Sequence, residues 1–193
     1  MDSREISNLS IFFQKFVGIG NKQSNKMAHQ VLKFDENEFE EFLVLLNELK
    51  DNVRNCQICK NYTNNDICQI CSSTTREKKL MIVESIEDIS RYEDWQFFKG
   101  KYFVFPIIFN NKFERKSDIN MDELIDYASN FDEVILALSA TIEGSLTANF
   151  VDESLSPITK VSHLANGVPV GSNIEYIDQL TFKHAFKNRK ESE

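Results

Sequence analysis

The cysteines of this chain form two Cys-x-x-Cys pairs within a short segment of the sequence. They are Cys56, Cys59, Cys68 and Cys71. Two such pairs allow four thiolates to surround one Zn²⁺ as a tetrahedron, with each sulfur about 2.3 Å from the metal. Four protein ligands leave no open coordination position, so the spacing predicts one structural, non-catalytic zinc ion per chain.

Two other chemistries also use clustered cysteines. Disulfides are disfavoured in the reducing cytosol, and residues 1–5 lack the basic and then apolar pattern of a secretory signal. An iron–sulfur cluster stays an alternative, although the usual spacing of the ferredoxin types is lacking here. Zinc in a cytoplasmic protein is the favoured interpretation, and we expect the metal to link the N-terminal helices to the rest of the fold.

Basic residues are concentrated near the N-terminus, although the chain carries a net charge of −8. Residues 11–34 contain no acidic side chain and four lysines, namely Lys15, Lys22, Lys26 and Lys33. The negative net charge argues against a protein that coats nucleic acid through general basicity. A site for a polyanion is therefore expected in this first segment.

The segment Gly18-Ile19-Gly20 interrupts two helical apolar patterns in that basic region. A helix-hairpin-helix has this form: Gly18 and Gly20 permit a tight turn, and the first amides of the second helix can face a phosphate. Lys22 and Lys26 are four residues apart, so they share one face of that helix. The residues alone leave open a DNA-binding hairpin or an ordinary helical pair with a solvated lysine face.

Two carboxylates follow segments that we expect to be buried strands. Glu84 follows the apolar run 80–83, and Glu143 lies in the polar segment 139–145 after the run 134–138. Ligands of parallel sheets collect beyond the carboxyl ends of the strands. A Mg²⁺ site requires several converging carboxylates, and two are few. A polar loop without metal is therefore favoured over a Mg²⁺ site.

Helices precede the cysteines, and strands alternate with helices after them. Apolar spacing predicts helices over 6–16 and around 27–32, and Asp35 with Glu38 forms a capping pair for a third. The later elements are expected as strands at 80–83, 102–109, 134–138 and 158–164, and as helices at 121–129, 145–153 and 182–189. Such alternation is typical of a mostly parallel sheet.

The composition is that of a globular protein. Of the 193 residues, 41% are hydrophobic and 27% are charged, which excludes a disordered or collagen-like chain. No apolar run approaches the roughly 18–20 residues that cross a bilayer, so no membrane partner is expected.

Taken in order, these motifs resemble the bacterial recombination mediator family RecR. The hairpin at 16–22 and the four cysteines match the first half of the family pattern. The remaining matches are Arg76-Glu77 with 80–84, Glu143-Gly144 with Thr147-Ala148, the glycine-rich segment 167–171, Glu175-Tyr176 and Asp178. The resemblance covers nearly the whole chain.

The resemblance implies a multi-module chain of the α+β or α/β class. Its parts would be a helix-hairpin-helix DNA-binding and oligomerisation region at 1–54 and a four-cysteine zinc finger at 55–72. A Toprim α/β domain with a mostly parallel sheet would follow at 79–174, and a C-terminal oligomerisation segment of strand and helix at 175–193.

The function implied is that of a non-enzymatic mediator of recombinational DNA repair. Family members form dimers and ring-like tetramers that clamp DNA, and with RecO, and often RecF, they help load RecA onto gapped DNA. Lys22, Lys26, Gly18 and Gly20 would then contact DNA, and the Toprim loop with Glu84 and Glu143 would bind a partner protein.

Toprim enzymes use a strand-end glutamate, an Asp-x-Asp pair and Mg²⁺. By position, this chain keeps Glu84 but has Ser139 and Thr141 in place of the two aspartates. The resemblance and the residues therefore both predict a protein without catalytic turnover. Two alternatives remain: a Mg²⁺-dependent Toprim nuclease or primase-like enzyme, and a zinc-stabilised interaction module that does not bind DNA.

Overall fold

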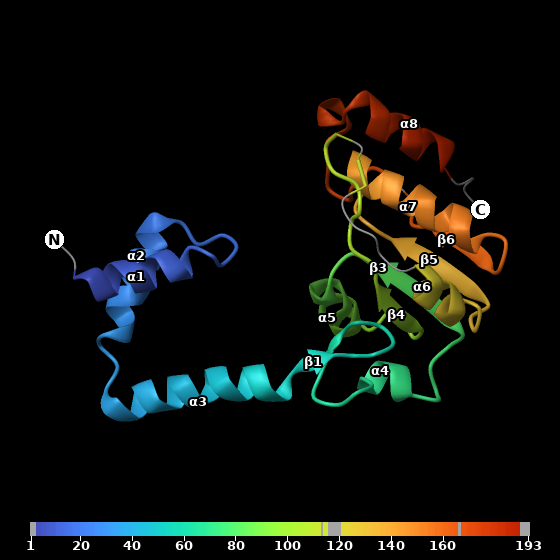
Figure 1. Cartoon of the computed structure of the whole chain (residues 1–193). Coiled ribbons are helices and arrows are strands. Elements are labelled where there is room, and N and C mark those ends of the chain that lie inside the picture. The colour runs from blue at the N-terminus through green and yellow to red at the C-terminus, as the bar shows by residue number, and fades with distance from the viewer. Residues whose placement is uncertain (1–2, 113, 116–120, 166, 190–193) are drawn as a thin grey trace. The chain divides into compact units, whose positions relative to one another are not determined.

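The computed structural model describes residues 3–112, 114–115, 121–165 and 167–189, with backbone alone at position 180. The chain folds as two units, which we call the N-terminal unit (Met1–Val53) and the C-terminal unit (Arg54–Glu193). The first is helical and the second contains the sheet, as Figure 1 shows.

The N-terminal unit begins with two packed helices, α1 (Arg4–Phe13) and α2 (Asn21–Val31). Phe13 and Ala28 are buried between them. The buried hydroxyls of Ser10 and Ser24 lie 3.1 Å apart and form a hydrogen bond, so polar atoms at this contact are satisfied. Helices lie on both sides of the glycine segment as predicted, although α1 ends at Phe13 rather than at 16 and α2 begins already at Asn21.

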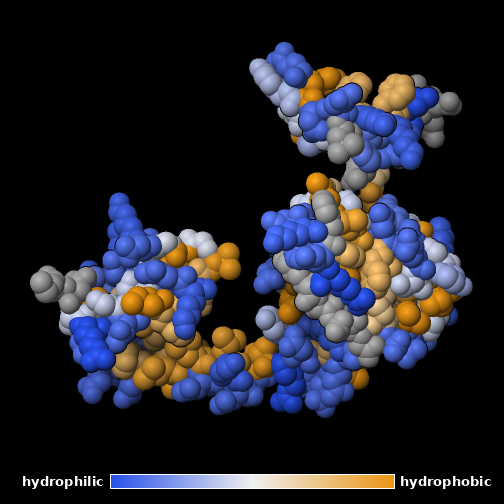
Figure 2. Space-filling view, turned by 45° about the horizontal axis from the view of Figure 1, so that its top comes forward, coloured by the Kyte–Doolittle hydropathy of each residue, from blue (hydrophilic) through white to orange (hydrophobic). Residues whose placement is uncertain are grey.

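The third helix, α3 (Glu36–Asn52), begins at the predicted capping pair. Asp35 accepts a hydrogen bond from the Glu38 amide, and the Glu38 side chain accepts one from the Asp35 amide. None of its residues is buried, although its sequence contains a stripe of leucines and phenylalanines. Figure 2 shows apolar atoms on the surface of this unit. A helix of this kind normally covers its apolar face with another element.

The C-terminal unit contains a parallel four-stranded sheet in the order β4-β3-β5-β6. The strands are β3 (Lys79–Val83), β4 (Lys101–Val104), β5 (Glu133–Ala137) and β6 (Lys160–His163). The helices are α5 (Ile86–Trp95), α6 (Met121–Ala128), α7 (Ile142–Leu155) and α8 (Gln179–Lys187), and Ile174–Tyr176 forms a 3₁₀ turn. The predicted, mostly parallel sheet is confirmed.

Helices cover both faces of this sheet. Leu80 and Ile82 point to a core that includes Leu124 of α6 and Val151 of α7. The alternate residues of β3 point to the opposite core, which includes Ile89 of α5. Alternation of side chains along a strand and burial on both faces explain why β3 is an almost continuous apolar run.

The cysteine module (residues 54–72) is built from three short elements. Strands β1 (Arg54–Asn55) and β2 (Tyr62–Thr63) pair antiparallel, and the helix α4 (Gln69–Ser72) follows.

In the described residues, no helix has the length and apolar character needed to cross a bilayer.

Two elements differ from the expectations. Helix α5 was not predicted, although Ser85 and Asp88 form a capping box at its start. Strand β4 ends at Val104, whereas the apolar pattern predicted a strand over 102–109. Pro106 has no amide to donate to a ladder, so the chain leaves the sheet there while Phe105 and Ile108 remain buried in the core.

A charged network joins the segment before β3 to α5 and β4. The Arg76 guanidinium forms an ion pair with both carboxylate oxygens of Glu93 and donates to the Gly100 carbonyl at 2.7 Å. The Tyr102 hydroxyl donates to Glu93 at 2.8 Å. The pKa of Glu93 is held below its ordinary value, chiefly by the hydrogen bond from Arg76.

We predict that Glu93→Gln lowers the free energy of unfolding at pH 7 by about 1–2 kcal/mol, because it removes the charge that pairs with Arg76. A carboxylate with a lowered pKa stabilises the fold above the ordinary glutamate pKa, and this stabilisation fades as the pH falls through the lowered value. The difference between variant and wild type should therefore shrink in acid. Urea unfolding, followed by the fluorescence of the single tryptophan, Trp95, between pH 7 and about pH 3 measures it.

The matched control is Asp94→Asn, on the exposed side of the same helix. It should change the unfolding free energy by less than about 0.5 kcal/mol at every pH. A Glu93→Gln effect that stayed constant across the pH series would contradict an electrostatic origin.

Candidate functional site

The four cysteine sulfurs lie within 4.8 Å of one another, and all four side chains are buried. None forms a disulfide, and the sulfurs of Cys59 and Cys68 are 3.5 Å apart. Sulfurs at about 2.3 Å from a tetrahedral metal would be separated by about 3.8 Å. The donor set therefore fits a four-coordinate thiolate metal site, as the spacing predicted.

Tight turns in the backbone bring the two Cys-x-x-Cys pairs together. The Lys60 amide donates to the Cys56 carbonyl at 3.1 Å, and Lys60 itself has φ of 68°. Amides of Cys68 and Cys71 donate to the sulfurs of Cys56 and Cys68, at 3.3 and 3.4 Å. The pKa of Cys68 is lowered, chiefly because the Cys59 thiol, and next the Cys71 thiol, hydrogen-bond to it. The pKa of Cys59 is raised, chiefly by the same contact with Cys68, and the pKa of Cys71 is raised as well, so the contacts within the cluster favour one thiolate, at Cys68.

The cysteine module is fastened to the edge strand β4. The Val104 amide donates to the Cys59 carbonyl at 3.0 Å, and the Lys101 ammonium donates to the Cys71 carbonyl at 2.7 Å. Lys60 also forms an ion pair with Glu123 of α6 at 2.6 Å. These contacts tie the module to the edge of the sheet. The expected link from the metal to the N-terminal helices stays a prediction.

The glycine turn before α2 has the geometry of a tight helical hairpin. Gly18 has φ of +80°, a conformation that favours glycine, and Gly20 caps α2 without any side chain. The Gln23 and Ser24 amides donate to the Gly20 carbonyl at 3.0 and 2.9 Å, so the two amides before them, at the start of α2, are the ones that could face an anion.

Lys22 and Lys26 are exposed on one face of α2, while Ser24 and Ala28 face α1. The first turn of this helix carries no acidic residue. The structure thus brings both predicted lysines together beside the hairpin turn. His29 is the next residue on the same face, and the sequence pattern gave no reason to select it.

An apolar groove of about 530 Å³ lies beside the hairpin, within the N-terminal unit. It is lined by Phe12, Phe13, Phe16, Val17, Ile19, Met27, Gln30, Val31, Phe34, Phe42 and Leu46. Phe12 and Phe16 are about half exposed, so large aromatic side chains face solvent here. Apolar patches of this kind commonly mark a surface that binds another protein.

Glu84 lies at the topological switch point of the sheet, where the connections before and after run to opposite sides of β3. Its strand, β3, pairs with β4 on one side and with β5 on the other, and ligands of such sheets bind beyond these strand ends. The Glu84 carboxylate accepts a hydrogen bond from the Ser139 amide at 3.1 Å. The structure therefore places Glu84 against the predicted loop, where it holds the backbone after β5.

The loop itself is arranged by its hydroxyl groups. Thr141 caps α7 by accepting a hydrogen bond from the Gly144 amide at 3.0 Å, and the hydroxyls of Ser139 and Thr141 are 3.3 Å apart. Glu143 lies in the first turn of α7, where a negative charge is favourable. The loop therefore offers the Glu84 carboxylate, which is already engaged with a backbone amide, the Glu143 carboxylate at a helix end, and two hydroxyls. This set of groups makes a poor Mg²⁺ site.

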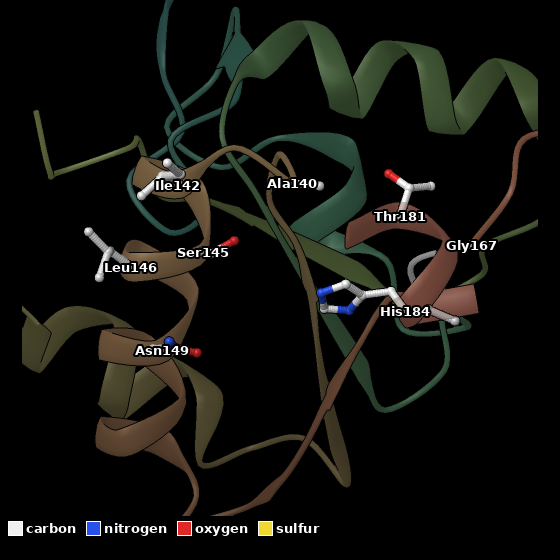
Figure 3. A pocket seen from close by; sticks show the side chains of 9 residues that line it. Ala140, Ile142, Ser145, Leu146, Asn149, Gly167, Thr181 and His184 are labelled. Carbon is white, nitrogen blue, oxygen red and sulfur yellow. The ribbon is translucent and has the colours of Figure 1, made fainter. Parts of the chain in front are cut away.

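A second cavity, of about 540 Å³, lies between α7 and α8. In Figure 3 the His184 imidazole extends from α8 toward α7, and the Ser145 hydroxyl points into the same space. In the part of the chain that the structure describes, no hydrogen bond joins these two side chains. A nucleophilic serine requires a base in hydrogen-bond contact and a third group that orients it, and the Ser145–His184 pair lacks this arrangement in the described structure.

Known proteins resemble the chain along most of its length. A Toprim domain model matches residues 78–165, and a model described as RecR, C-terminal, matches residues 167–190. The recombination protein RecR of Mycoplasmopsis pulmonis is 38% identical over 191 residues, which cover 98% of this chain and 100% of that protein. The proteins of the same name from Prochlorococcus marinus (strain MIT 9312) and Francisella philomiragia are 34% and 38% identical, over 97% and 91% of this chain and 96% and 90% of theirs.

We predict that Gly144→Ala destabilises the C-terminal unit by about 1–3 kcal/mol. A Cβ atom at Gly144 would lie 2.0 Å from the Ser139 carbonyl oxygen, so either the loop or the start of α7 must move. Thermal unfolding measures the loss.

Gly167→Ala is the matched control, because a Cβ atom there would meet nothing within 4 Å. Its unfolding temperature should equal that of wild type. Equal stability of both variants would show that close packing at Gly144 does not hold the loop.

Proposed function

This chain belongs to the RecR family of recombination proteins, and we propose that it is a non-enzymatic DNA-binding mediator of recombinational repair. The observation that carries the proposal is the exposed pair Lys22 and Lys26, next to the glycine turn and the first amides of α2. Ammonium groups and helix-end amides together suit the phosphates of a DNA backbone. Gly18 and Gly20 would allow that backbone to approach closely.

We further propose that the chain works as a homodimer or homotetramer that forms a ring-like clamp on DNA. In a single chain, α3 buries none of its apolar residues. The C-terminal segment also exposes large apolar side chains, namely Val170, Ile174, Tyr176, Phe182 and Phe186. Both ends of the chain therefore present surfaces that association would cover, which agrees with the assembly mode of the family.

The partner proteins that we propose are RecO-like proteins and, as a second partner, RecF-like proteins, with which the clamp would promote RecA loading on gapped DNA in the cytoplasm. The strand-end loop with Glu84 and Glu143 is the proposed contact. It lies at the carboxyl end of the parallel strands, where sheets of this class form their binding sites.

The loop geometry supports a role without catalysis. Glu84 is engaged with the Ser139 amide, and hydroxyls of Ser139 and Thr141 occupy the positions where a Toprim enzyme carries aspartates. A Mg²⁺-dependent nuclease or primase-like enzyme is thus the weaker alternative. An interaction module that does not bind DNA is the other, and DNA binding distinguishes it.

The metal that we propose for the four cysteines is one structural Zn²⁺ per chain. Their burial and mutual distances suit a closed tetrahedral site, in which the ion supplies cross-links and no reactive position. Cys56, Cys59, Cys68 and Cys71 would hold it. Its cross-links would hold the module in the conformation whose Cys59 and Cys71 carbonyls accept from β4.

We predict that the double variant Lys22→Glu and Lys26→Glu binds gapped DNA more weakly, because it removes two phosphate contacts and adds repulsion. The slope of log affinity against log salt should fall in magnitude by about 2, at about 0.9 per contact. Anisotropy of labelled gapped DNA over a salt series, with Mg²⁺ present, measures both quantities, and gel analysis of the same samples reports strand integrity.

A double variant of two lysines outside the hairpin, Lys50→Ala and Lys160→Ala, is the control and should retain most of the slope. An unchanged slope for the charge-reversed variant would exclude the hairpin as the DNA site. Cleaved strands would favour the enzyme, and absence of binding by wild type at low salt would favour the module that does not bind DNA.

We predict that purified wild type contains about one zinc ion per chain and that Cys59→Ser loses it. The variant should also unfold more easily by more than about 4 kcal/mol, since metal binding contributes directly to folding. Plasma mass spectrometry gives the metal content, and urea unfolding followed by Trp95 fluorescence reports on the C-terminal unit.

Ser72→Ala, next to Cys71 in the module, should keep both the metal and the stability. Wild type that contains no zinc after purification without chelators would refute the site.

A further inference from the structure

Tyr127 reaches the cysteine cluster from helix α6, which lies far along the chain. Its hydroxyl oxygen is 3.7 Å from the sulfur of Cys71, at a separation of 56 positions. That distance is within hydrogen-bond range for sulfur. The spacing of the cysteines does not predict this contact. Neither the motifs nor the family models assign Tyr127 a role.

Aromatic packing holds the Tyr127 ring in place. It meets the ring of Phe131 edge to face, with centroids 5.0 Å apart, and it lies 6.1 Å from the ring of Phe103 on β4. The residue is partly buried beside the main core. Because both neighbouring rings belong to the core, the position of the hydroxyl is set by the sheet and α6, independently of the cysteine module.

The charge of the site explains what a hydroxyl can do there. Four thiolates with one Zn²⁺ carry a net charge of −2, and buried charge requires hydrogen-bond donors. Backbone amides within the module serve the sulfurs of Cys56 and Cys68. Among the described hydrogen bonds to cysteine sulfur, the one from Tyr127 is the one that comes from a side chain outside the module.

We propose that Tyr127 is a positioning residue for the metal site, and that its hydroxyl donates a hydrogen bond to the Cys71 thiolate. A cysteine that ligates metal has lost its proton, so the hydroxyl must be the donor. This donation draws charge from one sulfur and couples the metal to α6. The inference rests on the zinc site proposed above.

Tyr127→Phe tests the proposal, because it removes the hydroxyl and retains the ring. The full-length protein is loaded with Co²⁺, and the sulfur-to-cobalt charge-transfer absorption is recorded. Loss of the hydrogen bond makes the thiolate a stronger electron donor, so the band should move to longer wavelength. Zinc affinity, measured by competition with a chromogenic chelator, should fall about tenfold, as expected for loss of a group that supports a ligand.

Two further variants separate the hydrogen bond from packing. Tyr102→Phe removes a hydroxyl that donates to Glu93, in the same unit, and should leave the band and the affinity unchanged. Phe131→Leu loosens the packing of the Tyr127 ring but keeps its hydroxyl. Because that packing places the hydroxyl, Phe131→Leu should shift the band in the same direction but by less than Tyr127→Phe. A band shift in Tyr102→Phe as large as in Tyr127→Phe would show an unspecific effect and overturn the proposal.

The outcomes also distinguish this inference from the metal site itself. A wild-type cobalt band with no change in Tyr127→Phe, in band or in affinity, would overturn the role of Tyr127 and leave the metal site intact. Absence of a cobalt band in wild type would overturn both. A shifted band and weaker zinc binding in Tyr127→Phe but not in Tyr102→Phe would establish the hydrogen bond.

Discussion

The crowding of four buried sulfurs in one small module is the constraint on which the C-terminal unit depends. A cation that takes the place of the thiol protons would hold the four sulfurs at these distances, and the backbone carbonyls of Cys59 and Cys71 accept hydrogen bonds from β4. Because β4 is an edge strand, the module covers an edge that a further strand or a helix covers in other sheets. A metal site and a sheet edge are therefore stabilised together.

The polar groups of the strand-end loop are engaged with the local backbone. Glu84 accepts a backbone hydrogen bond, Thr141 caps a helix, and Gly144 allows α7 to approach the loop closely. Each of these groups stabilises the local backbone, which a carboxylate committed to a metal could not do. These contacts agree with the proposal of a protein that acts by contact.

Local patterns predicted much of this architecture, since they depend on neighbouring residues. The cysteine spacing, the capping pair at Asp35 and the buried strand β3 are of that kind. Helix α5 was not predicted because it has few apolar residues, and these gave only a weak helical pattern. Its capping box was the stronger signal in the sequence. The ends of β4 and the contact of Tyr127 with Cys71 depend on tertiary packing, and no local pattern encodes contacts between positions so distant in sequence.

If copies of the chain associate through the exposed apolar stripe of α3, the stability of this protein depends on its concentration. Residues such as Leu45 and Leu49 are more than half exposed in one chain. If copies cover them on association, the free energy of unfolding rises with the logarithm of protein concentration. The amount of protein in the cell would then set how much of it is folded and assembled, so expression level itself becomes a control on repair capacity.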